Sequence, residues 1–161
     1  CAAFFLADAI SVINLQCPSP AHMLKILRKF KKNKINECIS TIAESIGIER
    51  ATPTLLSRMS KSTTGFSDMI ESNSHSKIIS QKYQHMISNS LFADCYFFLG
   101  YINRNNFIKI KDLHRKPEFI HILKTAFDLE GDSIKIESQA NELHNTANFL
   151  LSISHDDIKN F

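Results

Sequence analysis

The chain has 161 residues, of which 43% are hydrophobic and 22% charged, and its formal net charge is +3. These values are typical of a folded globular domain and exclude a disordered chain or one embedded largely in a membrane. With four glycines and no tryptophan, the sequence holds little material for the glycine-rich loops that cradle phosphates. We expect a single helical domain over residues 1–161.

Apolar residues recur at three- and four-residue spacing along almost the whole chain, a pattern typical of amphipathic helices. The first predicted helix covers residues 2–15. It contains Asp8 and is shorter than the ~20 residues that a membrane span needs. We therefore expect a buried core helix that ends before Cys17-Pro18.

Ser19-Pro20 is a helix start signal, and it predicts a second helix over residues 21–34. Its apolar positions form one stripe, and the segment from Lys25 to Lys34 has six basic residues and no acid. Such a basic amphipathic helix is typical of segments that bind a partner protein or an anionic membrane surface. Only Phe30 stands among the charges, which disfavours single-stranded nucleic acid. The candidate partner-binding residues are Lys25, Arg28, Lys29 and Lys32.

The middle of the chain continues the helical pattern, with one polar interruption. After a loosening at Asn33, residues 35–46 are predicted to continue the apolar stripe of the second helix as far as Gly47, and Thr52-Pro53 opens the next helix. The following residues are rich in serine, threonine and asparagine. We therefore expect a polar loop near residues 60–76.

The second half of the chain is predicted to add three more helices. Residues 77–102 are apolar on almost every side, which indicates a central helix. Asn103–Asn106 is expected to be a turn, and residues 107–111 an extended segment or a helix start. Two further helices are predicted at residues 116–130, ended by Gly131, and at 133–153, with a core-facing stripe. The fold class is thus all-α, a compact bundle of about six helices.

Cys1, Cys17, Cys38 and Cys95 permit two disulfides in any of three pairings. No Cys-x-x-Cys motif supports a zinc ribbon or a thioredoxin-like site. Free buried thiols in a reducing compartment and two bridges in an oxidising one both remain open. The sequence therefore leaves cytoplasmic and secreted locations equally open.

The best candidate for chemistry is the set His114, Glu118 and His121. Glu118 and His121 have the Glu-x-x-His spacing of di-iron helical bundles, but such sites need a second pair, which the sequence lacks. Pro117 also starts the helix, so His114 falls outside it. We expect structural histidines and predict no catalytic residue, metal or cofactor.

The absence of catalytic signatures and the basic helix together predict a non-enzymatic protein-interaction or scaffold module. The alternative is a secreted, disulfide-bonded helical bundle that acts as a signalling protein or carries a small apolar ligand. A helical enzyme with a metal or histidine site is the third hypothesis.

Overall fold

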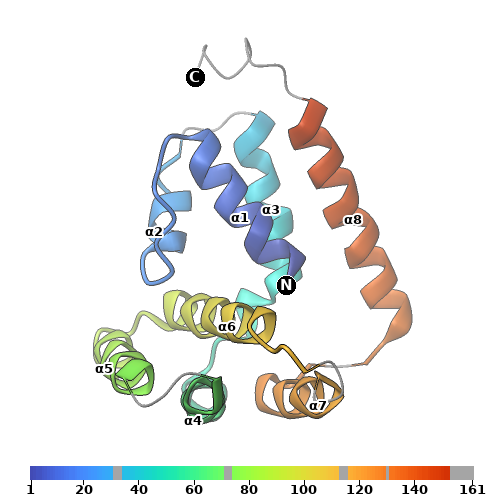
Figure 1. The fold of residues 1–161 in the computed structure, drawn as a ribbon. Helices are drawn as coiled ribbons and strands as arrows, with labels where there is room; N and C mark the ends of the chain where they lie inside the picture. The colour runs from blue at the N-terminus through green and yellow to red at the C-terminus, as the bar shows by residue number, and fades with distance from the viewer. Residues whose placement is uncertain (31–33, 71–73, 113–115, 130, 153–161) are drawn as a thin grey trace. The chain divides into compact units, whose positions relative to one another are not determined.

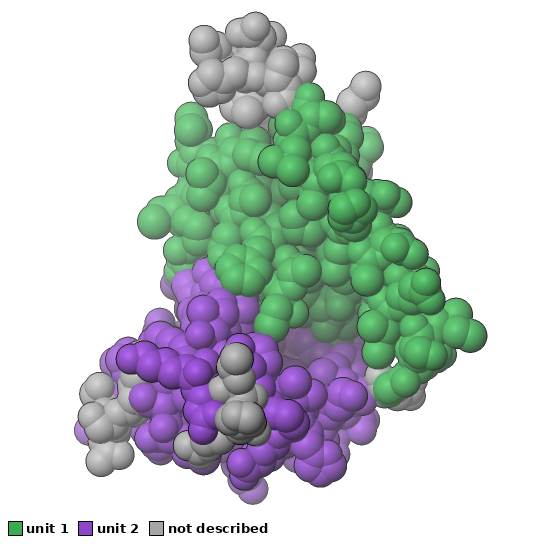
Figure 2. All heavy atoms as spheres, turned by 45° about the vertical axis from the view of Figure 1, so that its right-hand side comes forward, with its two compact units in different colours: residues 1–19, 23–47, 131–161 green, residues 20–22, 48–130 purple. Residues whose placement is uncertain are grey.

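The structure is a computed structural model that describes residues 1–30, 34–70, 74–112, 116–129 and 131–152. These residues form eight α-helices and one 3₁₀ helix and no strand, which confirms the predicted all-α class (Figure 1). The chain divides into two compact units, coloured in Figure 2. Unit 1 comprises residues 1–19, 23–47 and 131–161, and unit 2 comprises residues 20–22 and 48–130. The single domain expected over residues 1–161 stays a prediction.

Unit 1 is built on the first predicted helix, which packs against α2 and α3. Ala7 and Ile10 of this helix are fully buried. Ser11 is buried beside them, and its hydroxyl donates to the Ala7 carbonyl at 3.0 Å and lies 3.1 Å from the Met23 sulfur. Gly47 ends α3 with a φ of 78°, as predicted. The helices of unit 1 are α1 (Ala2–Ile13), α2 (Met23–Leu27), α3 (Lys34–Ile46) and α8 (Ser133–Ser152).

The last helix forms where it was predicted, but the prediction that its apolar stripe faces the core is wrong. Thr146 is the only buried residue among the described residues of α8, and Ile136 is 51% exposed. Within unit 1, α8 packs mainly on α3 and makes fewer contacts with α1. Contact along one side of the helix therefore leaves much of the predicted stripe at the surface.

Unit 2 is organised around α4, which packs against α5, α6 and α7. The predicted start of α4 is confirmed, because the hydroxyl of Thr52 accepts a hydrogen bond from the Leu55 amide at 3.3 Å. As expected of a central helix, α6 supplies the largest fully buried side chains of the protein, Tyr96, Phe97 and Phe98. The elements of unit 2 are η1 (Ile48–Arg50), α4 (Pro53–Ile70), α5 (Ser74–Ser88), α6 (Phe92–Ile108) and α7 (Lys116–Phe127).

The prediction of a polar loop near residues 60–76 is wrong. Helix α4 continues to Ile70 and α5 starts at Ser74, while residues 71–73 lie outside the described residues. The hydroxyl of Thr63 donates to the Met59 carbonyl at 2.7 Å, a bond within the helix that satisfies this polar side chain. The buried side of α4 also includes Ser60 and Ser67. This polar composition of α4 is the reason why the sequence predicts a loop where the structure has a helix.

The turn predicted at Asn103–Asn106 is also wrong, because these residues lie inside α6. The amide of Asn103 donates to the Thr63 hydroxyl, and the amide of Asn106 donates to the Ser67 hydroxyl, each at 2.7 Å. All four side chains are buried, where polar groups need partners. These two pairs, which we call the α4–α6 polar ladder, explain why asparagine occurs within a helix here. Helix α6 ends at Ile108, so residues 107–108 end a helix rather than start one.

The long helix predicted over residues 77–102 is two helices, α5 and α6. Ser90 has a φ of 56°, and the Leu91 amide donates to the Met86 carbonyl at 2.8 Å. This is a Schellman motif with serine in the left-handed position that glycine usually occupies. Asp128, with a φ of 53°, follows Phe127 at the end of α7, so Gly131 does not end that helix. The break at Ser90 adds one helix to those that were predicted.

Gly65 lies in the interior of α4 with an exposed surface and nothing within 4 Å of an added Cβ. Alanine restricts the unfolded chain and favours the helix, so Gly65→Ala should raise the free energy of unfolding by about 1 kcal/mol. Urea unfolding followed by circular dichroism measures this change. An unchanged or lower stability would contradict an open, regular helix at this position.

Candidate functional site

The basic helix predicted over residues 21–34 is shorter in the structure, where α2 covers Met23–Leu27. Its apolar residues Met23, Leu24 and Leu27 are buried. Three of the four predicted partner-binding residues are exposed on the other side, and Lys32 lies outside the described residues. These three exposed cations, which we call the basic face, are Lys25, Arg28 and Lys29.

The basic face sits on a segment that the protein interior holds in place. The Arg28 amide donates to the Leu24 carbonyl at 3.0 Å, which continues the helical turn beyond α2. The contact between Ser11 and Met23 ties α2 to α1. The apolar stripe is therefore buried, and the charged side chains of the same segment are exposed.

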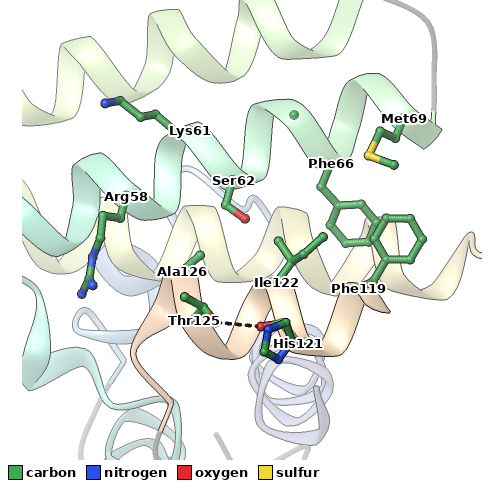
Figure 3. Close-up of a pocket in the computed structure, with 11 residues that line it drawn as sticks. Arg58, Lys61, Ser62, Phe66, Met69, Phe119, His121, Ile122, Thr125 and Ala126 are labelled. Atoms are coloured by element: carbon green, nitrogen blue, oxygen red, sulfur yellow. Dashed lines mark hydrogen bonds between the residues drawn. The ribbon is translucent and has the colours of Figure 1, made fainter. Parts of the chain in front are cut away.

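A cavity of about 550 Å³ lies between α4 and α7, and we call it the α4–α7 groove (Figure 3). One end of the groove is lined by the ring of Phe66, which stacks on Phe119 with ring centroids 4.6 Å apart. Arg58 and Lys61 line it on α4, and His121 lines it on α7. The sequence did not predict this site, because most of its α4 wall falls in the segment that was read as a loop.

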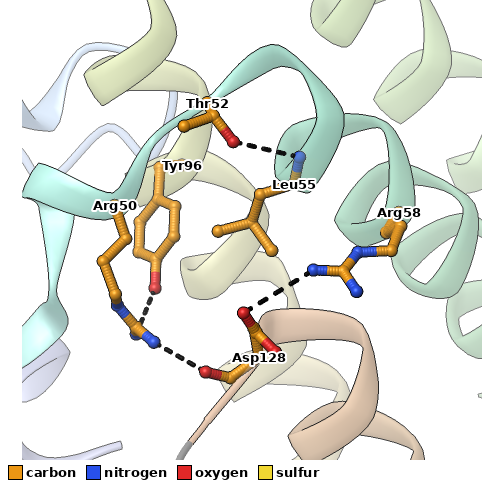
Figure 4. Close-up of polar contacts among 6 residues, drawn as sticks. All are labelled: Arg50, Thr52, Leu55, Arg58, Tyr96 and Asp128. Atoms are coloured by element: carbon orange, nitrogen blue, oxygen red, sulfur yellow. Dashed lines mark hydrogen bonds and ion pairs between the residues drawn. The ribbon is translucent and has the colours of Figure 1, made fainter.

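One end of the groove is positioned by a polar cluster around Arg50 (Figure 4). The Arg50 guanidinium donates to the backbone carbonyl of Asp128 at 2.9 Å and to the hydroxyl of Tyr96 at 2.7 Å. The carboxylate of Asp128 lies 3.9 Å from the guanidinium of Arg58. Burial raises the pKa of Tyr96, and the Arg50 charge opposes that rise. These contacts fix the end of α7 against η1, α4 and α6.

None of the four cysteines, all of them in the described part of the chain, forms a disulfide. Cys1 and Cys17 flank α1, whose 12 residues span about 18 Å, whereas a disulfide holds its Cα atoms about 4.4–6.8 Å apart. Burial raises the pKa of Cys95 to about 12, and desolvation also raises that of Cys38. Both thiols are therefore held neutral at physiological pH.

The structure describes only part of the predicted histidine cluster. His114 lies outside the described residues, while Glu118 and His121 are exposed on α7. Among the described residues, no group of three or more histidine, cysteine, aspartate or glutamate side chains could hold a metal ion. None of the described helices is both long and apolar enough to span a membrane.

With this geometry in hand, we compared the chain with known proteins. No family model, curated protein or solved structure gives a significant match.

Proposed function

We propose that this chain is a helical protein-interaction module, not an enzyme, and that its basic face binds an acidic partner protein. One observation carries the proposal. The apolar residues of α2 are buried, whereas Lys25, Arg28 and Lys29 on the same short segment are exposed. Charges held on a packed element present a defined pattern to a partner, with little loss of backbone freedom on binding.

Surface cations of this kind act mainly on the rate and specificity of association. Complementary charge accelerates encounter and disfavours wrongly charged partners, and the effect weakens as salt is added. Insertion into a membrane would instead use the apolar side of α2. Because Met23, Leu24 and Leu27 are buried, the arrangement favours an acidic protein over a lipid bilayer.

The alternative of a secreted bundle depended on two disulfides. The cysteines lend it no support, since none of them is bridged.

The test is a quantitative pull-down with the full chain as bait. The triple variant Lys25→Gln, Arg28→Gln, Lys29→Gln should lose the partners that the wild type retains, and 0.5 M salt should release them. The matched control Lys77→Gln, Lys124→Gln, Lys135→Gln removes the same charge from exposed positions elsewhere and should retain them.

Circular dichroism of the triple variant should match that of the wild type, because the substituted side chains are exposed. Equal retention by the triple variant and the wild type would exclude the basic face. Binding to vesicles with 30% phosphatidylserine, without any acidic protein partner, would identify a membrane surface instead and contradict the proposal.

A further inference from the structure

The α4–α7 groove differs in chemistry from one end to the other. The two helices run antiparallel along it, because Phe66 stacks on Phe119 at one end while Arg58 lies beside Asp128 at the other. The first end is apolar and the second carries charge. Both walls belong to unit 2, and the cavity of about 550 Å³ has the size typical of small-molecule sites.

At the apolar end of the groove, hydrophobic side chains remain partly exposed to solvent. Below the stacked rings of Phe66 and Phe119, a cluster with Ile110 closes the interior. Met69 and Ile122 line the groove and are 54% and 39% exposed. A hydrocarbon chain would cover these side chains, and the flexible thioether of Met69 can adapt to its shape.

The charged end of the groove carries cations in excess. Arg58 and Lys61 lie about one turn apart on α4, and the described residues that line the groove include no carboxylate. Among the described residues, Arg58 has an ion pair with Asp128, whose carboxylate lies 3.9 Å away and whose side chain is 76% exposed. A guanidinium with one long, solvated contact retains donors for a second carboxylate, which it binds in a bidentate manner.

Between these two ends the groove is lined by Gly65 and Ser62. Gly65 lines the groove with nothing within 4 Å of an added Cβ, although glycine weakens a helix interior. The hydroxyl of Ser62 is buried and has no hydrogen-bond partner among the described residues. Its side chain extends from α4 toward α7 (Figure 3).

The groove is long enough for an extended chain to pass from its charged end to its apolar end. Arg58 and Met69 are 11 residues apart on α4, so the groove is about 16 Å long.

We infer that the α4–α7 groove binds a long-chain carboxylate. The hydrocarbon tail lies along Phe66, Met69 and Ile122, passes over Gly65, and places its carboxylate between Arg58 and Lys61. This site is separate from the basic face, so it adds a second binding activity to the proposed function.

Isothermal titration calorimetry of the full chain with dodecanoate tests the inference. Dodecanoate should bind with one-to-one stoichiometry, and dodecyltrimethylammonium, which has the same tail and the opposite charge, should bind at least tenfold more weakly. Arg58→Gln with Lys61→Gln should weaken dodecanoate binding at least tenfold. The control Lys77→Gln with Lys135→Gln should change it less than twofold.

Gly65→Leu should abolish binding by filling the groove, while thermal unfolding shows that the variant still folds. Gly65→Ala, which strengthens the helix, should bind more weakly than the wild type and so separates binding from stability. The basic-face triple variant should bind dodecanoate normally, whatever the outcome for its own partners.

Several results would overturn the inference. These are no binding of dodecanoate, equal binding of the two amphiphiles, or binding that Gly65→Leu leaves unchanged. Binding of an acidic amphipathic peptide by a chain that does not bind dodecanoate would assign the groove to a helical partner instead.

Discussion

Replacing Phe119 by alanine should lower the free energy of unfolding by about 3–5 kcal/mol, the usual cost of removing a buried aromatic ring. Phe119 is 3% exposed and stacks on Phe66 with ring centroids 4.6 Å apart. Among the described residues of α7, only Phe119 and Phe127 are buried. The substitution therefore removes one of the two buried anchors of α7 and leaves an unfilled space at the apolar end of the α4–α7 groove.

Urea unfolding of the full chain, followed by far-ultraviolet circular dichroism, measures this loss. Ile120→Ala is the matched control, because Ile120 is the next residue on α7 and is 41% exposed. That variant should stay within about 0.5 kcal/mol of the wild type. A loss below 1 kcal/mol for Phe119→Ala would show that the stacked pair does not anchor the helix.

Raising the pH above 9 should destabilise the protein through Cys95. Its thiol is fully buried in α6, and burial raises its pKa from 9.0 to about 12. Above pH 9 the unfolded chain releases this proton while the folded chain keeps it. The stabilisation is therefore complete below pH 9 and is lost as the pH rises toward 12, at about 1.4 kcal/mol per pH unit.

The change in stability between pH 8.5 and 11 can be measured by urea titration at each pH. Cys95→Ala removes the titrating thiol, and its stability should fall with pH less steeply by about 1.4 kcal/mol per unit. Tyr96 is present in both proteins, and its own raised pKa cancels in the comparison. Equal slopes would show that the Cys95 thiol ionises in the folded protein as it does in water.

The parts of the fold that the sequence predicted well are those with local chemical signals. Thr52 and Pro53 mark the start of α4, and Gly47 marks the end of α3, because a capping hydroxyl and a left-handed glycine act within a few residues. The central position of α6 followed from its nearly continuous apolar run. In each case, the residues responsible for the feature lie close together in the sequence.

The errors lie where distant residues decide the structure. Thr63 and Asn103 are 40 positions apart, and the hydrogen bond between them across two helices adds to the bond that each makes within its own helix. Ser90 ends α5 without glycine, so nothing local distinguished this break from a continuous helix. Tertiary packing overrode intrinsic preference at the Thr63–Asn103 pair, whereas the break at Ser90 is a local Schellman motif that lacks the usual glycine.

The same division applies to the candidate sites. Charge spacing alone predicts Lys25, Arg28 and Lys29 as partner-binding residues, and in the structure all three are exposed. The α4–α7 groove depends on the contact between Phe66 and Phe119. The periodicity of the sequence does not predict which distant residues come into contact.

The α4–α6 polar ladder also constrains how this protein can change over evolutionary time. One residue inserted into either helix would rotate everything beyond it by about 100° and separate the matched amides and hydroxyls. Length variation among descendants should therefore fall in the connecting segments and spare the interiors of both helices. Positions 63 and 103 should mutate in step, with a nonpolar residue at one accompanied by a nonpolar residue at the other.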